Sequence, residues 1–139
     1  MDRQVSELST AEAIFTQYHR FDDGYLVAFD YACAPDGLTT VEMIFHGKDD
    51  YAEGNLWRSV KVTVEDVHEL VARWQKGYLN RIICGVKLLR FGELWCVDVD
   101  GVYNGVDDPA SLEEVRAEGE FYVVGRRVTA QALDVLHTA

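Results

Sequence analysis

Cysteine and proline are scarce in this sequence: its 139 residues include only 3 cysteines and 2 prolines. Cys33, Cys84 and Cys96 are odd in number and widely spaced, so they form neither a disulfide framework nor a paired Cys-x-x-Cys metal site. We expect three reduced thiols, mostly buried within strands.

Sequence patterns for catalysis are also missing. There is no glycine-rich phosphate-binding loop, no serine on a strand-to-helix elbow and no cysteine with an evident histidine partner. Ser9 and Ser111 are explained as helix caps. We therefore predict a protein with no catalytic residues and no cofactor.

No hydrophobic run approaches the roughly 18 residues that a membrane-spanning helix needs. The opening residues, MDRQVSELSTAEAIF, lack the basic segment followed by an apolar one that marks a secretory signal peptide. These two absences predict a cytoplasmic protein with no membrane partner.

Positive charge is in deficit: 13 Lys and Arg stand against 24 Asp and Glu, a net charge of -11. Such a field repels phosphate backbones, so we expect no nucleic-acid partner. The charges are also uneven. Between Glu69 and Glu93 all charged residues are basic, whereas in residues 91–120 all charged residues except Arg116 are acidic. Neighbouring strands of opposite charge predict a salt-sensitive homodimer, in which each patch meets its opposite on a second copy.

Enough apolar and aromatic residues are present for a packed interior. Hydrophobic residues make up 48% of the chain and aromatic residues 12%, a balance that disordered chains lack. Because the length matches the usual size of one domain, we expect a single domain over residues 1–139.

Alternating apolar residues predict three strands in meander order, within YLVAFDY, LTTVEMIFH and WRSVKVTV. The residues APDG at 34–37 suit the first hairpin turn. On a strand with one buried face, every second side chain points inward. The expected inward side chains are Tyr25, Val27, Phe29, Met43, Phe45, Val60, Val62 and Val64.

Two capping boxes, STAE at 9–12 and SLEE at 111–114, predict short helices that reach about His19 and about residue 118. Thr129 is the expected cap of a C-terminal helix, with Ala132, Leu133 and Leu136 inward.

Residues 65–74 fit a helix by periodicity and a strand by context, and we favour a strand because strands flank them. Further strands are expected at residues 82–90, at 94–99 and within EFYVVGRRV. Together these elements predict an α+β protein. Its core is an antiparallel sheet or flattened barrel of about seven strands, with short helices at the N- and C-terminal ends.

The stretch HRFDDGYL places His19, Asp22 and Asp23 close together, just before the first strand. An imidazole and carboxylates could bind Zn²⁺ or Mn²⁺. A metal site needs three convergent ligands, however, and adjacent residues rarely point at one ion. Asp-Asp-Gly is also a usual turn composition. We interpret the stretch as a turn and predict no metal site.

The loop DVDGVYNGVDDP at 98–109 begins like a calcium-binding loop but has Val, Tyr and Pro where an EF-hand needs Asp or Asn, Gly and Glu. Its carboxylates and tyrosine suggest a surface that recognises a basic protein, because loops often carry recognition and tyrosine can anchor an interface. The predicted partner-binding residues are Asp98, Asp100, Tyr103, Asp107 and Asp108.

The stretches FDDGYLVAFDY, LTTVEMIFHG, WRSVKVTVEDV and GVKLLRFGELWCVDVDG resemble small bacterial families of β-rich proteins, among them immunity proteins of polymorphic-toxin systems. The resemblance covers about residues 20–101. Asp22-Asp23-Gly24 stands where those families often have a His-Asp start, and no functional residue can be transferred. The resemblance implies a single-domain cytoplasmic binder without catalysis.

The leading hypothesis is a small acidic cytoplasmic binding protein without catalysis, such as an immunity-type inhibitor of a basic toxin. One alternative is a metal-dependent hydrolase with a dispersed site at His19, Asp22 or the loop from Asp98 to Asp108. Another is a structural or oligomerisation module.

Overall fold

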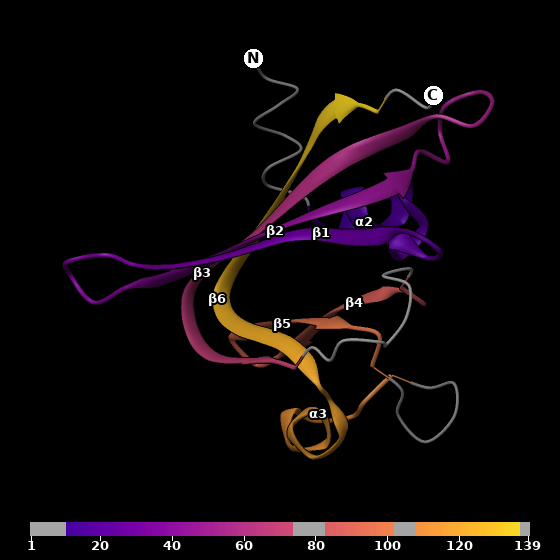
Figure 1. The fold of residues 1–139 in the computed structure, drawn as a ribbon. Helices are drawn as coiled ribbons and strands as arrows, with labels where there is room; N and C mark the ends of the chain where they lie inside the picture. Colours follow the sequence, from indigo (N-terminus) through magenta and orange to yellow (C-terminus); the bar gives the residue numbers. More distant parts are fainter. Residues whose placement is uncertain (1–10, 74–82, 102–107, 137–139) are drawn as a thin grey trace.

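The computed structural model describes residues 11–73, 83–101 and 108–136. In chain order the elements are α2 (Ala11–Gln17), the 3-10 helix η1 (His19–Phe21), β1 (Tyr25–Cys33), β2 (Thr39–Lys48), β3 (Trp57–Ala72), β4 (Val86–Phe91), β5 (Leu94–Val99), α3 (Leu112–Glu118) and β6 (Phe121–Val135). The strands form one antiparallel sheet in the order β1-β2-β3-β6-β5-β4 (Figure 1). None of the described helices has the length and apolar character to cross a membrane.

The prediction of an α+β protein built on an antiparallel sheet is confirmed, and so is the meander of β1, β2 and β3. The described residues form six strands, however, and the expected seven was wrong. A flattened barrel was also wrong, because β1 and β4 remain as two separate edges of the sheet. Residues 65–72 continue β3, as favoured.

The expected C-terminal helix was wrong, because Thr129 and the residues after it as far as Val135 continue β6. In this stretch Ala130 is buried, and Val128 and Ala132 pack against the same core, which is the two-residue period of a strand. Ala130 lies opposite Val62 and Ala132 opposite Val60. The first half of β3 needs a hydrogen-bonded neighbour on this side, and that need outweighs the local helical pattern.

Helices α2 and α3 lie near the positions predicted for the two short helices. At α3 the Ser111 hydroxyl accepts from the Glu114 N–H at 3.3 Å, and the Glu114 carboxylate accepts from the Ala110 N–H at 3.4 Å. The predicted cap is therefore confirmed. Helix α2 ends at Gln17, near the expected end, while its predicted cap at Ser9 lies outside the described residues.

A sharp bend divides the sheet into two halves. It lies where Asp66 of β3 has a φ of 52° and the pairing with β6 shifts register between Val67 and Glu69. Gly125 faces this point on β6, where a Cβ atom would lie 2.5 Å from a methyl carbon of Val64. Because β3 and β6 both run through the bend, each contributes to both halves (Figure 1).

The bend brings the apolar faces of the two halves around one core, which α2 and η1 close. The core side chains from the sheet include Val41, Met43, Phe45, Val60, Val62, Val64, Val86, Val97, Val99 and Val123. Phe21 of η1 is fully buried and stacks on Phe45 with 4.7 Å between ring centroids. Phe15 of α2 meets Phe21 edge-on at 5.3 Å.

The half of the sheet that contains β4 and β5 has a smaller apolar cluster on its other face, where α3 packs. It contains Leu89, Cys96, Val115, Tyr122 and Val124. One carboxylate joins α3 to the sheet here: Glu69 accepts from Arg116 Nε at 2.9 Å and from the Tyr122 hydroxyl at 2.9 Å. Burial and this hydrogen bond raise the pKa of Tyr122 to about 12.

The inward face of β1 differs from the prediction in its first half. The register against β2 shifts between Leu26 and Ala28, so Val27 is the extra residue of a β-bulge. Leu26 and Phe29 therefore pack against the core, whereas Tyr25 and Val27 are 37% and 47% exposed. The inward assignments of Tyr25 and Val27 were wrong. Phe29 is partly buried. The other five side chains that were predicted to point inward, on β2 and β3, are fully buried.

Mutations can distinguish the inward-facing positions of the sheet from the outward-facing ones. Phe45→Ala should lower the free energy of unfolding by about 3–5 kcal/mol, because it leaves a cavity beneath Phe21. Val27→Ala should change it by less than about 1 kcal/mol, because the side chain faces water. Chemical denaturation of both variants measures the difference. A large loss for Val27→Ala would contradict the bulge.

Candidate functional site

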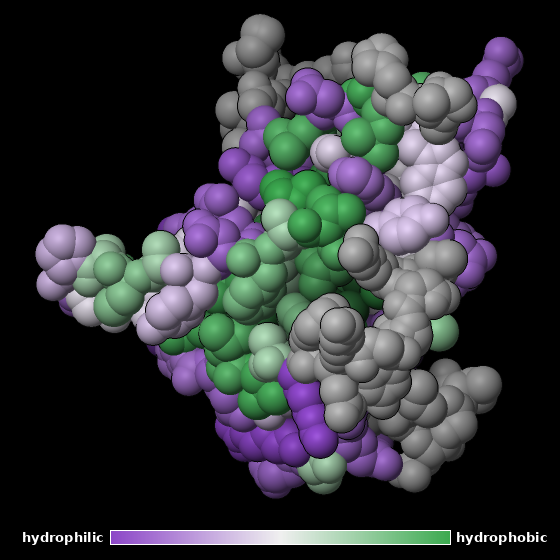
Figure 2. Space-filling model, in the orientation of Figure 1, coloured by the Kyte–Doolittle hydropathy of each residue, from purple (hydrophilic) through white to green (hydrophobic). Residues whose placement is uncertain are grey.

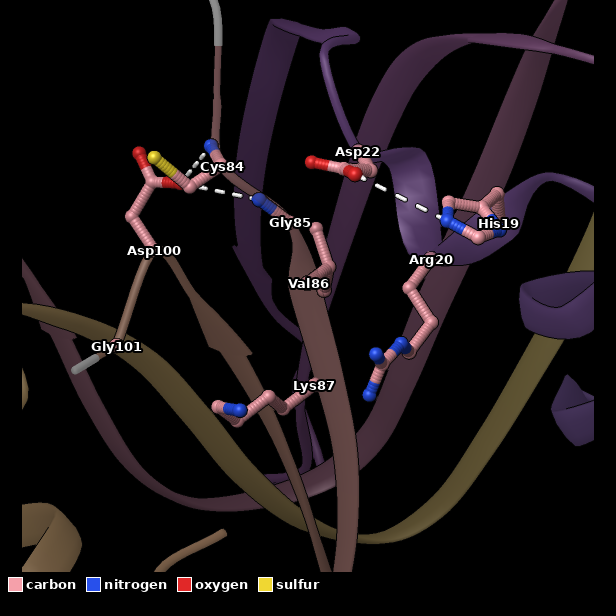
Figure 3. Close-up of a pocket in the computed structure, with 9 residues that line it drawn as sticks. All are labelled: His19, Arg20, Asp22, Cys84, Gly85, Val86, Lys87, Asp100 and Gly101. Atoms are coloured by element: carbon pink, nitrogen blue, oxygen red, sulfur yellow. Dashed lines mark hydrogen bonds and ion pairs between the residues drawn. The ribbon is translucent and has the colours of Figure 1, made fainter. Parts of the chain in front are cut away.

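A hollow of about 120 Å³ lies where the turn after α2 meets β4 and the end of β5 (Figure 3). Three sequence-distant segments line it: residues 19–22, residues 84–87 and residues 100–101, Phe21 excepted. It brings together the two stretches that the sequence singled out, HRFDDG and the loop that begins at Asp98. We therefore treat this hollow as the candidate functional site.

The turn that forms one wall has an unusual backbone. His19, Arg20 and Phe21 have φ values of 52°, 53° and 58°, so three successive residues with a Cβ atom are left-handed. Each such residue costs roughly 1–2 kcal/mol. Burial of the Phe21 ring against Phe45 offsets part of this cost. Strained backbone that the surrounding packing maintains is concentrated at functional sites.

Backbone hydrogen bonds join the walls of the hollow to one another. Asp23 N–H donates to the Ile83 carbonyl at 3.0 Å, and Ile83 N–H donates to the Gly24 carbonyl at 2.9 Å. Gly24 also lies tightly against β2, where a Cβ atom would come within 2.3 Å of the His46 carbonyl oxygen. Asp100 N–H donates to the Gly85 carbonyl at 2.9 Å. The hollow is therefore preformed by the fold.

Asp100 holds the start of β4 in place. Its carboxylate accepts a short hydrogen bond from the Cys84 N–H and a second, at 3.3 Å, from the Gly85 N–H. Burial raises the pKa of Asp100 above its usual value of 3.8, although the two backbone donors act in the opposite direction. The residue is left-handed, with a φ of 60°, a conformation that Asp and Asn tolerate better than most residues.

The hollow has charges of both signs. In the view of Figure 3, Asp22 and Asp100 lie toward one end and the side chains of Arg20 and Lys87 toward the other. Lys87 Nζ lies 3.0 Å from the Asp108 carboxylate, whereas Arg20 has no ion-pair partner among the described residues. Such a lining suits a polar ligand, or a partner's side chains, with hydrogen-bond donors for the carboxylates and acceptors for Arg20 and Lys87.

Histidine and cysteine contribute little reactive chemistry to the hollow. His19 lies 3.9 Å from Asp22 and 3.5 Å from Asp50, but nowhere in the described ranges do three His, Cys, Asp or Glu side chains gather as a metal site. The Cys84 sulfur lies on the Asp100 side and His19 on the opposite side (Figure 3). His19–Phe21 form η1, and Asp22 and Asp23 form the turn that leads into β1, in agreement with the interpretation of this stretch as a connection before the first strand.

The predicted partner-binding residues have different environments. Asp98 is buried, so it does not belong to the surface. Asp100 caps the start of β4, and Asp108 is exposed and paired with Lys87. Tyr103 and Asp107 lie outside the described residues. The role of this loop in binding therefore stays a prediction, carried among the described residues by Asp100 and Asp108.

Sequence reasoning missed Arg20 and Lys87. Arg20 takes its position from a left-handed turn that contains no glycine at that point, and Lys87 is one basic residue in an ordinary strand pattern. Only the tertiary contact between the turn and β4 brings them to the same hollow. Comparison of the chain with protein-family models, curated proteins and solved structures gave no match.

Asp100→Asn tests the electrostatics of the site. The variant keeps an acceptor oxygen for the Cys84 and Gly85 N–H groups and removes the charge that burial disfavours. A raised folded-state pKa means that Asp100 favours folding more as the pH falls. The stability of the variant relative to wild type should therefore be greatest at neutral pH and shrink as the pH falls toward 3.8. Denaturation at several pH values measures this. A relative stability that rises as the pH falls would contradict it.

Arg20→Gly tests the strain of the turn. Glycine adopts positive φ without steric cost, so the variant should raise the free energy of unfolding by up to about 1 kcal/mol. Asp66→Gly is the matched control, because Asp66 has a similar φ of 52° and lies outside the hollow. If only Asp66→Gly stabilises, contacts of the Arg20 side chain hold the turn.

Proposed function

We propose that this protein is a non-catalytic binding protein that associates with a basic protein partner. The observation that carries the proposal is that basic side chains form ion pairs within the chain to a greater extent than acidic side chains do. A majority of the described basic side chains lie within 4 Å of a carboxylate of the same chain: Arg58, Arg73, Lys87, Arg116, Arg126 and Arg127. Most of the acidic excess therefore remains on the surface.

The basic and acidic segments of the sequence meet within one chain. Lys87 of the basic segment pairs with Asp108 of the acidic one, and Arg73 pairs with Glu120 at 3.5 Å. Arg90 lies over the ring of Trp95, with 4.7 Å from its guanidinium carbon to the ring centroid. These contacts favour a role for the remaining carboxylates with a different protein over a charge-driven pairing of two copies.

Helix α3 supplies the most distinct acidic surface. Glu113 and Glu118 are exposed and, within the described part of the chain, have no ion-pair partner. Asp108, which pairs with Lys87 from the lining of the hollow, precedes this helix. We name Glu113 and Glu118 the acidic surface. The lower end of the molecule, where α3 lies, is mainly hydrophilic (Figure 2). Such a field increases the association rate with a basic partner.

The environments of Cys96, His46 and His68 support binding without catalysis. Burial and the nearby Asp98 raise the pKa of the Cys96 thiol to about 12, so this thiol remains protonated at neutral pH. Burial lowers the pKa of His46, and His68 lies beside Asp66 at the bend. An immunity-type inhibitor of a basic toxin is the specific form of binding protein that fits a small acidic chain.

The double variant Glu113→Lys, Glu118→Lys tests this proposal. It should reduce the association rate with the partner by about tenfold at low salt and weaken the salt dependence. The free energy of unfolding should fall by no more than about 1 kcal/mol, because both side chains face water and only Glu113 lies in the first turn of α3. The partner is first captured from the native host with tagged wild-type protein, and association is then measured by surface plasmon resonance.

The matched control is Glu12→Lys, Glu53→Lys. It changes the net charge by the same amount at two exposed positions outside α3. An equal effect of both double variants would show that the overall charge acts, not α3. Capture of no basic protein would contradict the proposal. The inhibitor form additionally requires that a toxin encoded beside this gene loses its toxicity on co-expression.

A further inference from the structure

β1 is an edge strand that is unusually open for a soluble protein. It is the first strand of the sheet order, and among the described residues no strand pairs with its outer side. Tyr31 is 56% exposed, and YLVAFDYAC contains one charge, Asp30, and no lysine or proline. Natural sheet edges usually carry several charged residues, especially lysine, or a proline, and these residues prevent association with another strand. The β1–β2 hairpin also projects from the body (Figures 1 and 2).

The hairpin turn shows which backbone groups of β1 face outward. Ala34 N–H donates to the Leu38 carbonyl at 2.9 Å, so Ala34 bonds toward β2. Hydrogen-bonding direction alternates along an antiparallel strand. Ala32 and Asp30 therefore bond toward β2, and the N–H and C=O groups of Phe29, Tyr31 and Cys33 point to the open edge.

We propose that this edge binds a second copy of the chain, with two β1 strands antiparallel about a two-fold axis at Tyr31. In this register Tyr31 faces its own copy, and Phe29 faces Cys33 of the second chain. All three outward-facing residues are then hydrogen-bonded in both chains, as one continuous sheet. Asp30 faces Ala32, so the only charge of the strand has no like charge directly opposite it.

The other two-fold registers make fewer or less favourable contacts. An axis at Asp30 places two carboxylates opposite each other. An axis at Phe29 brings Tyr31 against Val27, where the bulge interrupts the ladder. An axis at Ala32 or Cys33 brings Pro35 into the pairing, and proline has no N–H to donate. The chemistry of the strand is thus self-complementary in one register, which is why a second copy is the favoured occupant.

Tyr31→Lys tests the proposed dimer. It places two like charges side by side at the axis and should raise the dimer dissociation constant by about tenfold or more. Leu38→Lys is the matched control, because Leu38 is 50% exposed on the same hairpin but lies across the turn from the open edge. We expect wild type and Leu38→Lys to sediment as dimers and Tyr31→Lys as a folded monomer, with folding checked by circular dichroism.

Disulfide cross-linking tests the register. In chains carrying Cys33→Ser and Cys84→Ser, Tyr31→Cys places two cysteines on the axis, where the Cα separation of about 5.5 Å permits a disulfide. Mild oxidation should produce a covalent dimer, and Leu38→Cys in the same background should not. A monomeric wild type, or equal cross-linking at both positions, would overturn the proposal. A dimer that dissociates in salt and survives Tyr31→Lys would also overturn it, in favour of pairing by charge.

Discussion

The bend shared by β3 and β6 determines the shape of the rest of the molecule. Both strands are long, and each contributes its first and second halves to different halves of the sheet. Without the left-handed Asp66 and the small Gly125, the strands would continue straight and the two apolar faces would not approach each other. The bend therefore creates one enclosed core from one sheet.

The hollow is a consequence of how that core is closed. The concave sheet leaves a gap that α2 and Phe21 fill. To bring the Phe21 ring onto Phe45, the chain passes through a left-handed turn, and this turn then meets β4 and β5. Burial of one aromatic ring and the position of Arg20 at the surface are thus coupled. A single local geometry serves both the core and the candidate site.

Most of the local structure could be predicted from the sequence. The meander, the fifth strand and α3 depend on alternation and on a capping box, which are properties of neighbouring residues. The bulge at Val27 could not, because an extra residue in β1 reverses the inward face without interrupting the apolar pattern. The strand at 129–135 depends on a partner about 70 residues away. The hollow joins residues 20, 87 and 100, whose proximity only the tertiary fold determines.

The pairing of β3 with β6 also affects the order in which the protein folds during synthesis. β3 ends at Ala72, but the strand that completes both halves of the sheet begins only at Phe121. While the ribosome adds the intervening residues, the side of β3 that faces β6 has no native partner, and the core remains open. Non-local strand pairing forms slowly and exposes apolar surface before it forms. The nascent meander therefore exposes apolar surface until β6 has been synthesised.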